Sequence, residues 1–445
     1  MKYVSTRGGE AVSLDQAIAA GIAKDGGLFV PDPVPAFALK DFEDATTIHE
    51  VAQVLLGPFF EGSALAPHLG AIIGETFSFP IPLTKLSVAT GDLHMLELFH
   101  GPTAAFKDIG AGFLAACLSR LQRDQSVPLT ILVATSGDTG GAVAAAFNER
   151  PGMRVVVLFP EGRVSQRQAR QLTCWGDNVL SLAVHGSFDD CQALVKEAMA
   201  NADLNARHRF SSANSINIGR LLPQCTYYAH ASLARYRESG QKPSFIVPTG
   251  NLGNGLALML CKQMGLPVAD VILATNENRV IGDYLEEGEW LPTESKPTLA
   301  SAMDVGNPSN MERVLALFGD AASLHRLIRA VSVSDQHIEE EIREGNTDFG
   351  FAICPHTATA CHVYRHLSDE ERRMKNWIVV ATAHPAKFEQ IVEPLTGHLL
   401  DLPDSLRAIL DRPVHSVSIG PDLASFEMAL EDRFGLDARS SAGDK

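Results

Sequence analysis

The amino-acid sequence predicts an α/β protein with two parallel-sheet lobes and an N-terminal segment. Apolar runs of strand length alternate with helix-patterned stretches beyond residue 92, which is typical of parallel strands flanked by helices. A chain of 445 residues exceeds one ordinary domain, so two lobes that share a cleft are expected. Hydrophobic residues make up 45% of the chain and charged residues 20%, which excludes a disordered or fibrous protein.

Residues 1–92 form the predicted N-terminal segment, with irregular structure that caps the lobes. It combines a short amphipathic stretch at 14–22 with turn-forming residues at 24–27 and 31–35. The first ten residues lack the apolar core of a signal peptide, and no apolar run approaches the ~18 residues of a membrane-spanning helix. We therefore expect a cytoplasmic protein with no membrane partner.

Residues 93–235 form the first predicted lobe. A largely buried strand over 93–100 leads into a turn, and Ser165 and Ser187 stand where they can cap helices. The other strands of this lobe are predicted from apolar, β-rich runs at 129–134, 155–159 and 179–184.

Residues 236–445 form the second predicted lobe, which ends in a charged tail. Its strands are predicted at 245–247, 271–273 and 377–380. Helical patterns are found at about 311–330, 334–344 and 355–367. Residues 276–310 are rich in turn formers and predict a surface loop that could act as a lid.

The formal net charge of −16 restricts the partners of the protein. A negative surface repels phosphate backbones and anionic lipid headgroups, so no nucleic acid or membrane partner is expected. Any phosphate that the protein binds must therefore be held by a local group of donors.

The seven cysteines include no CxxC pair, and they predict reduced thiols in the core. Cys354, His356, Cys361 and His362 form the grouping closest to a metal site, but their spacing matches no common ligand pattern. No metal site is predicted.

Lys107 is the candidate catalytic residue. It lies between a Gly101-Pro102 turn and a helix that is predicted from Leu114, Cys117, Leu118 and Leu121. The positive end of the helix dipole, together with desolvation by Phe106, is expected to lower the pKa of this lysine. Such a lysine is a nucleophilic amine, suited to a Schiff base with a carbonyl. A solvated lysine near a helix start is the alternative.

Three further stretches have the composition of anion sites. The glycine-rich turn at 248–255 lies between a strand and a helix, and it predicts either a phosphate cradle or simply a tight turn. The turn at 135–141 could bind a carboxylate through main-chain N–H groups. Arg220, in the run 212–220, could bind a second phosphate, that of a substrate, or could be a solvated surface arginine.

Five motifs, in order along the chain, resemble those of the threonine synthase family. They are HGPTAAFKD at 100–108, ATSGDTG at 134–140, SANSIN at 212–217, GNLGN at 250–254 and TAHPAKF at 382–388. The resemblance covers nearly the whole chain and is to the longer, bacterial and fungal branch, which has an N-terminal segment before the lysine. It implies a tryptophan-synthase-β-like, fold-type II enzyme that uses pyridoxal 5'-phosphate.

The resemblance also implies a role for each motif. Lys107 would hold pyridoxal phosphate as a Schiff base, and the hydroxyl of Thr382 would face its pyridine nitrogen. Unlike a carboxylate, a hydroxyl does not force that nitrogen to stay protonated, so the ring is a weaker electron sink. The cradle of the cofactor phosphate would comprise Gly250, Asn251, Leu252, Gly253 and Asn254. The substrate would contact Ser136, Gly137, Asp138, Thr139, Asn214 and Arg220.

The activity implied by the resemblance is the conversion of O-phospho-L-homoserine and water to L-threonine and phosphate. This reaction is the last step of threonine biosynthesis, and a monomer or homodimer is expected to carry it out. Two alternatives stay open. One is a phospho-lyase on the same scaffold that releases 2-oxobutyrate, and the other is a catalytically silent metabolite-binding module.

Overall fold

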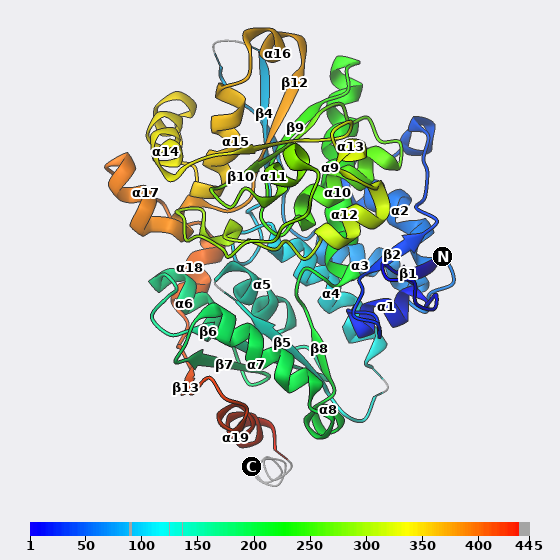
Figure 1. Cartoon of the computed structure of the whole chain (residues 1–445), viewed down its shortest axis with the longest axis vertical. Helices are drawn as coiled ribbons and strands as arrows, with labels where there is room; N and C mark the ends of the chain where they lie inside the picture. Colours follow the sequence, from blue (N-terminus) through cyan, green and yellow to red (C-terminus); the bar gives the residue numbers. More distant parts are fainter. Residues whose placement is uncertain (89–90, 124, 136, 436–445) are drawn as a thin grey trace.

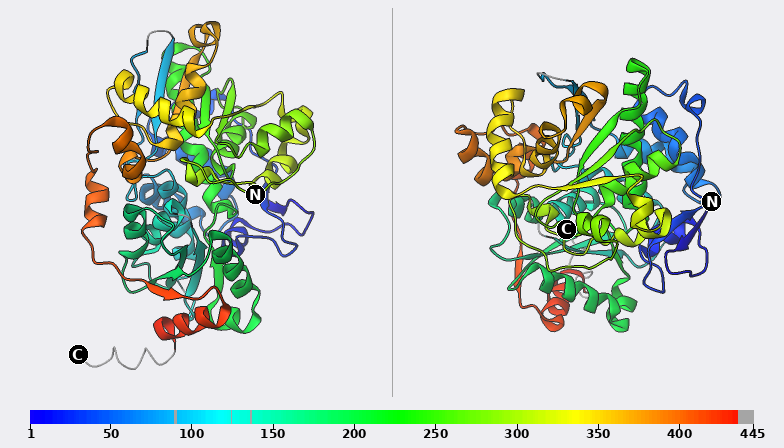
Figure 2. Two further views of the ribbon diagram at one scale, coloured as in Figure 1. Left: turned by 60° about the vertical axis from the view of Figure 1, so that its left-hand side comes forward. Right: turned by 45° about the horizontal axis from the view of Figure 1, so that its top comes forward.

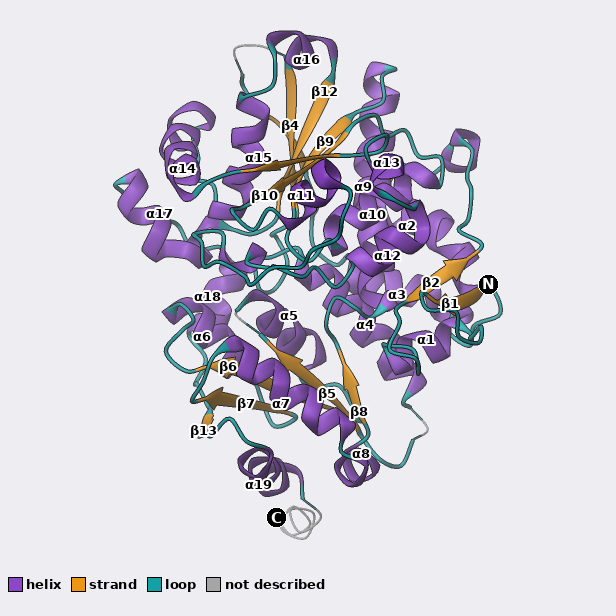
Figure 3. Ribbon diagram, in the orientation of Figure 1, coloured by secondary structure: helices purple, strands orange, loops and turns teal. Residues whose placement is uncertain are grey.

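The computed structural model describes residues 1–88, 91–123, 125–135 and 137–435. One sheet lies in the upper part of Figure 1 and a second in the lower part, and helices surround both. In the view coloured by secondary structure, helices lie around the strands of both sheets (Figure 3). The α/β class with two parallel sheets is thereby confirmed.

The upper sheet has six strands in the order β11-β10-β9-β12-β4-β3, and only β3 runs antiparallel to its neighbour. Its strands are β3 (Leu83–Lys85), β4 (Asp92–Glu97), β9 (Ser244–Pro248), β10 (Val271–Thr275), β11 (Arg329–Ser332) and β12 (Asn376–Ala381). Helices cover both faces, since Ile246 and Val247 of the central strand β9 lie in two different apolar clusters. This burial explains why the central strands read as continuous apolar runs.

The lower sheet has five parallel strands in the order β13-β7-β6-β5-β8. They are β5 (Leu129–Ala134), β6 (Met153–Pro160), β7 (Val179–Val184), β8 (Phe210–Ser212) and β13 (Val417–Ile419). Leu132 and Val133 lie in different apolar clusters, so this sheet is also covered on both faces. The predicted strands at 129–134 and 179–184 are confirmed to the residue.

The helices that enclose the sheets begin at the capping residues expected from the sequence. Ser165 and Ser187 each accept a hydrogen bond from a backbone N–H in the first turn, within a capping box. The helices of the first half are α4 (Lys107–Leu121), α5 (Asp138–Phe147), α6 (Gln166–Thr173), α7 (Phe188–Ala200), α8 (Ala202–His208) and α9 (Ile218–Ser239). Those of the second half are α10 (Gly253–Gln263), α11 (Val280–Glu287), α12 (Met311–Phe318), α13 (Ala321–Leu324), α14 (Asp335–Phe349), α15 (Pro355–Arg365), α16 (Asp369–Met374), α17 (Glu389–Thr396), α18 (Asp404–Leu410) and α19 (Leu423–Phe434), with short 3-10 turns η4 (Ser301–Met303) and η5 (Pro385–Phe388).

The N-terminal segment is more regular than the sequence predicted. It contains an antiparallel pair of strands and three α-helices with 3-10 turns between them: β1 (Lys2–Ser5), α1 (Leu14–Ala20), β2 (Phe29–Asp32), η1 (Leu39–Phe42), α2 (Ile48–Leu56), η2 (Gly57–Phe60), η3 (Ala66–His68) and α3 (Leu69–Thr76). Helices α2 and α3 span only nine and eight residues, too few for a long periodic signal. Their apolar side chains share one cluster with α4 and α9, so the segment is part of the main core.

Two strands join a sheet other than the one predicted from their place in the sequence. β4 begins the predicted lobe 93–235 but pairs with β12, and β13 lies in the predicted lobe 236–445 but pairs with β7. Figure 2 shows the segment from α17 to α19 descending from the upper lobe to the lower one. The prediction was wrong here because the sequence of a short strand does not indicate which strand it will pair with. The pairing depends on how the neighbouring helices pack on the sheet.

All seven cysteines are buried and unpaired, as predicted for core thiols. Among the residues that the structure describes, no helix has both the length and the apolar character needed to cross a membrane.

Arg313 fastens the N-terminal segment to both neighbouring parts of the chain. Its side chain is fully buried on α12, and its guanidinium donates to Phe29 O at 2.9 Å, to Asn310 Oδ1 at 2.8 Å and to Ile216 O at 2.6 Å. Burial lowers the pKa of Arg313 to about 9. Three acceptors from three separate segments therefore depend on one side chain.

Arg313→Ala should lower the free energy of unfolding by about 3 kcal/mol, because it leaves three buried acceptors without donors. Urea denaturation followed by circular dichroism measures the loss. Arg7→Ala is the matched control, since Arg7 pairs with the adjacent Glu312 but is 54% exposed, where water screens the ion pair. Equal losses in the two variants would show that Arg313 does not fasten the segment.

Candidate active site

Lys107 is the first residue of helix α4, as predicted. The turn before it is attached to the residues that follow β12, since Phe106 N–H donates to Thr382 O at 2.9 Å and His384 N–H donates to Ala104 O at 3.0 Å. β4 and β12 are parallel neighbours, so both leave the sheet at the same edge. Lys107 therefore lies at the carboxyl edge of the upper sheet, where α/β proteins bind ligands.

The turn before Lys107 is held in shape by Asp108. This buried carboxylate accepts from Thr103 N–H at 2.8 Å and from the Thr103 hydroxyl at 2.5 Å, and burial raises its pKa. Glycine is required at position 101, because a Cβ there would lie 2.5 Å from Asp108 Oδ2. Because the turn and the helix approach each other closely, the direction of the Lys107 side chain is fixed.

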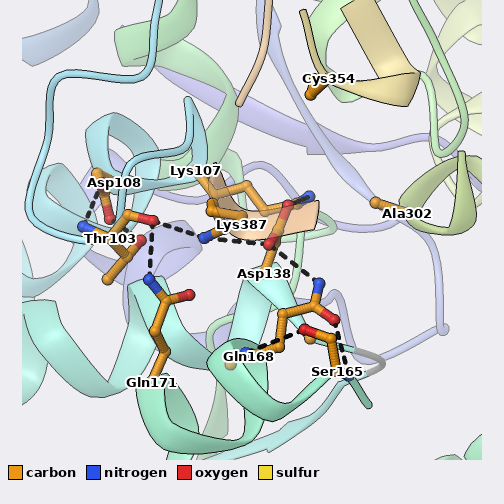
Figure 4. A network of polar contacts seen from close by, with 12 residues as sticks. Thr103, Lys107, Asp108, Asp138, Ser165, Gln168, Gln171, Ala302, Cys354 and Lys387 are labelled. Atoms are coloured by element: carbon orange, nitrogen blue, oxygen red, sulfur yellow. Dashed lines mark hydrogen bonds and ion pairs between the residues drawn. The ribbon is translucent and has the colours of Figure 1, made fainter. Parts of the chain in front are cut away.

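Asp138, the first residue of α5, lies between two lysines (Figure 4). Its Oδ2 is 3.8 Å from Nζ of Lys107, and its Oδ1 is 3.1 Å from Nζ of Lys387. Gln168 Nε2 also donates to Oδ1, at 3.4 Å. The carboxylate comes from the lower sheet and both lysines come from segments at the edge of the upper sheet, so the cluster spans the two lobes.

Charge and burial together set the chemistry of this cluster. Burial lowers the pKa of Lys107; the Asp138 carboxylate opposes this effect, and the positive charges of Lys387 and Arg220 add to it. Burial also disfavours the ionised form of Asp138, but the ammonium groups of Lys387 and Lys107 hold the pKa of Asp138 well below its ordinary value. The cluster thus holds an ionised carboxylate beside an amine that releases its proton more readily than usual.

The Phe106 ring makes a contact with Lys107 that the sequence did not predict, beside the burial that lowers the pKa of this lysine. Nζ of Lys107 lies 5.2 Å from the centroid of the Phe106 ring. An ammonium over an aromatic ring is stabilised, so this ring favours the charged form of the lysine. The sequence could not indicate which part of the ring would face the amine.

The glycine-rich turn joins β9 to α10, as predicted. Leu252 has a left-handed backbone with φ 62°, which turns the chain into the helix at Gly253. Asn251 is held by its side chain, which donates to Ser215 Oγ at 2.7 Å and accepts from Ser309 N–H at 2.6 Å. These contacts fix the shape of the turn, and this shape fixes the positions of the first N–H groups of α10.

Side-chain amides gather around Gly253 at the start of α10. A Cβ on Gly253 would make ordinary contacts with two of them, at 3.6 Å to Asn310 Nδ2 and 3.8 Å to Gln224 Nε2. Asn254 Oδ1 accepts from two tyrosine hydroxyls, and its buried Nδ2 has no partner in the described part of the chain. Amide donors gathered at a helix N-terminus suit an anion. These residues fit the phosphate of pyridoxal phosphate.

The predicted surface loop at 276–310 contains helix α11 and packs over the glycine-rich turn. Ala302 N–H donates to His356 Nε2 at 3.0 Å, and a Cβ on Gly250 would lie 2.7 Å from Cα of Met303. Asn310 Nδ2 donates to Asn251 O at 3.0 Å. The predicted surface loop is present over residues 288–297, which are mostly exposed and lack regular structure, whereas residues 300–310 pack onto the glycine-rich turn through contacts that the sequence did not indicate.

The turn between β5 and α5 places the residues that resemblance assigned to the substrate. Ser136 lies outside the described residues. Gly137 caps α5 with φ 147°, and its N–H donates to Thr135 Oγ1 at 3.0 Å. Asp138 faces Lys107, and Thr139 is half-buried in the first turn of the helix. The carboxylate site inferred from this turn stays a prediction.

Arg220 and Asn214 flank the start of α9. Arg220 is 4% exposed, its Nη1 donates to Ala213 O at 2.6 Å, and burial lowers its pKa to about 10. Its Nε has no partner among the described residues. The alternative of a solvated surface arginine is therefore wrong. Asn214 is half-buried, and its backbone N–H donates to Ser212 Oγ at 3.2 Å.

Thr382 follows β12 directly, and its residue is 6% exposed. Its carbonyl accepts the Phe106 N–H, which brings Thr382 and the Lys107 turn together. Lys387, in the same motif, received no role from the sequence. Its burial beside Asp138 could not be predicted, because a lysine in a turn is ordinarily solvated.

Comparisons with known proteins identify the family of this chain. The model of the threonine synthase N terminus matches residues 2–77, that of the pyridoxal-phosphate dependent enzymes matches 78–383, and that of the threonine synthase C-terminal region matches 357–429. Threonine synthase of Escherichia coli (strain K12) is 38% identical over 418 residues, which cover 94% of this chain and 96% of that protein. The chain belongs to the threonine synthase family.

Solved structures of the family share this fold. The crystal structure of threonine synthase from Escherichia coli has a TM-score of 0.86 and 36% identity, and covers 97% of this chain and 100% of its own. The pyridoxal-phosphate-bound threonine synthase from Brucella melitensis has a TM-score of 0.89 and 32% identity, with 97% and 99% covered. The predicted fold-type II class and the predicted cofactor are confirmed.

Gly253→Ala should weaken cofactor binding without disturbing the fold, because its methyl group would lie among the amide donors that suit the phosphate. We expect the dissociation constant of pyridoxal phosphate to rise by about tenfold or more, the equivalent of one lost charge-assisted hydrogen bond. Equilibrium dialysis measures it. Gly250→Ala is the matched control and should instead lower the melting temperature, since its Cβ meets the backbone of Met303. Unchanged cofactor affinity in Gly253→Ala would place the phosphate elsewhere.

Proposed function

We propose that this protein converts O-phospho-L-homoserine and water into L-threonine and phosphate. The observation that supports this function best is the Lys107 amine, buried beside Asp138 at the carboxyl edge of the sheet with a lowered pKa. An amine in this state is the nucleophile that an aldehyde cofactor requires. A catalytically silent binding module has no use for it, so that alternative is not favoured.

Lys107 has two roles in the proposed reaction. Its Nζ would hold the cofactor through the cofactor's aldehyde carbon, with release of water, and once the substrate amine has taken that place the free Nζ would remove the proton from the substrate Cα. Pyridoxal phosphate, when bound, supplies the electron sink for the charge that develops at this carbon. Loss of a proton from Cβ then allows phosphate to leave from Cγ. Cγ takes up a proton and becomes the methyl group, water adds at Cβ, and Cα regains its proton.

Different residues bind the phosphate of the cofactor and the phosphate of the substrate. The turn from Gly250 to Asn254 at the start of α10 would hold the phosphate of the cofactor, and the hydroxyl of Thr382 would serve as the partner of the pyridine nitrogen. Arg220 binds the phosphate of the substrate, supported by the unpaired Nε of its buried guanidinium. The turn at Asp138 receives the substrate carboxylate through its N–H groups.

A turnover assay with O-phosphohomoserine tests the proposed function. Threonine and inorganic phosphate should form in equal amounts, with little 2-oxobutyrate. Formation of 2-oxobutyrate as the main product would replace the proposal with the phospho-lyase alternative, and absence of any product would contradict both.

We also propose that the enzyme acts in the cytoplasm as a monomer or a homodimer. The site draws its described residues from one chain, so a second chain is not needed to complete the cluster around Asp138. Light scattering after gel filtration measures the oligomeric state, and a tetramer or larger assembly would contradict this proposal.

Lys107→Ala should abolish both the visible absorbance of the bound cofactor and turnover, because the other amine of the cluster, that of Lys387, is already engaged by Thr103 O and Asp138. Absorbance spectra and the assay above measure the two effects. Lys85→Ala is a control at a lysine that is 74% exposed, and it should retain both properties. A Lys107→Ala protein with the parental spectrum and turnover would refute the assignment.

Arg220→Ala should lower kcat/KM for O-phosphohomoserine by roughly 10- to 100-fold, because a charge-assisted contact to a buried phosphate is lost. Inhibition by inorganic phosphate should weaken as well, since that ion would occupy the same subsite. The cofactor absorbance should survive, which separates this variant from Gly253→Ala. Parental kcat/KM together with parental phosphate inhibition would leave Arg220 with a structural role only.

A further inference from the structure

Lys387 is a buried cation to which the proposed reaction assigns no step. It lies in the 3-10 turn η5 after β12, and its side chain is 1% exposed. Its Nζ donates to Thr103 O at 2.5 Å and pairs with Asp138 Oδ1 at 3.1 Å. It thereby joins the turn that carries Lys107 to the helix that carries Asp138 (Figure 4).

The geometry of Asp138 favours Lys387 over Lys107. Lys387 is within hydrogen-bond distance of one carboxylate oxygen, whereas Lys107 lies 3.8 Å from the other oxygen, beyond the range of a hydrogen bond. A buried carboxylate must have a partner that compensates its lost hydration. If Lys107 were the only cation nearby, that partner would be the Lys107 ammonium, and the amine would be held in its unreactive charged form.

We propose that Lys387 is a positioning residue that serves as the permanent counter-ion of Asp138, and so leaves the nitrogen of Lys107 free to lose its proton and bond to the cofactor. This inference rests on the proposed function, because it gives Lys107 the covalent role. It extends that function by assigning a task to a second lysine of the site.

The other groups that face Lys107 do not replace Lys387. Arg220 on α9 is the second positive charge, but Asp138 makes no bond to it in the structure. On α15, burial lowers the pKa of His356 to about 4, so this ring is neutral near pH 7. Burial raises the pKa of the Cys354 thiol, which is therefore also neutral. Lys387 is thus the cation in contact with Asp138 on the side away from Lys107.

The sign of the effect follows from these charges. Lys387→Met keeps the length of the side chain and removes its charge, so Asp138 is left with Lys107 as its remaining cationic neighbour. The carboxylate then stabilises the protonated form of the Lys107 nitrogen more strongly. Because an opposite charge at this distance typically shifts a pKa by one unit or more, deprotonation should move to higher pH by about one unit or more.

Gln171 provides a matched control for a purely structural role. Its Nε2 donates to the same acceptor as Lys387, Thr103 O, at 3.2 Å, and its side chain is buried and uncharged. Gln171→Met therefore loosens the same turn without changing any charge near Lys107. Lys387→Arg restores the charge and tests whether a cation suffices.

The experiment is a pH titration of the visible absorbance of each holoenzyme, which reports protonation of the nitrogen that Lys107 contributes. The midpoint should rise by about one pH unit or more in Lys387→Met, return toward the parental value in Lys387→Arg, and stay parental in Gln171→Met. An unchanged midpoint in Lys387→Met, or an equal rise in Gln171→Met, would overturn the proposed role. A parental protein with no visible absorbance at all would instead contradict the proposed function.

Lys387→Met removes the nearest counter-ion of a buried carboxylate and could fail to fold, so a second comparison tests the same charge without the carboxylate. Asp138→Asn and the double variant Asp138→Asn/Lys387→Met both lack the carboxylate and differ only in the charge of Lys387. The midpoint should be lower in the single variant than in the double variant by about one pH unit, because the unopposed ammonium disfavours protonation nearby. Equal midpoints in these two proteins would overturn the proposal.

Discussion

The site depends on one backbone pairing, between the turn that carries Lys107 and the residues that follow β12. Ala105 and Ala383 form an antiparallel bridge, and hydrogen bonds on either side of it fasten the two segments. β4 and β12 run parallel along six residue pairs, so their carboxyl ends lie side by side at the edge of the sheet. Lys107, Thr382 and Lys387 reach the same small volume because of this pairing, although their segments lie far apart in the sequence.

The lower sheet contributes the Asp138 carboxylate to this volume, and that charge links the lobes. Asp138 stands at the start of α5, where the helix dipole favours a carboxylate. Its two oxygens face two lysines from the upper sheet, so any relative movement of the lobes changes both distances. Gln168 and Gln171 on α6 support the same contact, the first through Asp138 and the second through Thr103 O. The alignment of the lobes and the state of Lys107 are therefore coupled.

The sequence indicated the features that depend on local chemistry and missed those that depend on distant partners. Strands such as 129–134 and the caps at Ser165 and Ser187 follow from nearby residues, and they were predicted correctly. The start of α4 at Lys107 was predicted for the same reason. The sheet to which β4 belongs was not, because β12 lies in another part of the chain.

The candidate site shows the same division. The glycine-rich turn and the surface loop at 276–310 were located from their composition. The hydrogen bonds from the end of this loop to Asn251 and His356 were not predicted, because these partners lie far away in the sequence. Arg220 looked equally suited to solvent, and only its burial removes that alternative. Lys387 was missed because its environment is made by Thr103 and Asp138, which the sequence does not place beside it.

The ion pair of Asp138 and Lys387 explains why a carboxylate can be present where a neutral amide would disturb Lys107 less. A buried carboxylate without Lys387 would either take up a proton or hold Lys107 as an ammonium. In the first case Asp138 loses its charge, and in the second case the Lys107 nitrogen is not free to react. Paired with Lys387, the carboxylate keeps its charge, and the pair as a whole is neutral. Lys107 then experiences a nearby dipole instead of a net negative charge. The two residues therefore act as one unit, and a change in either alone alters the charge around Lys107 by one full unit.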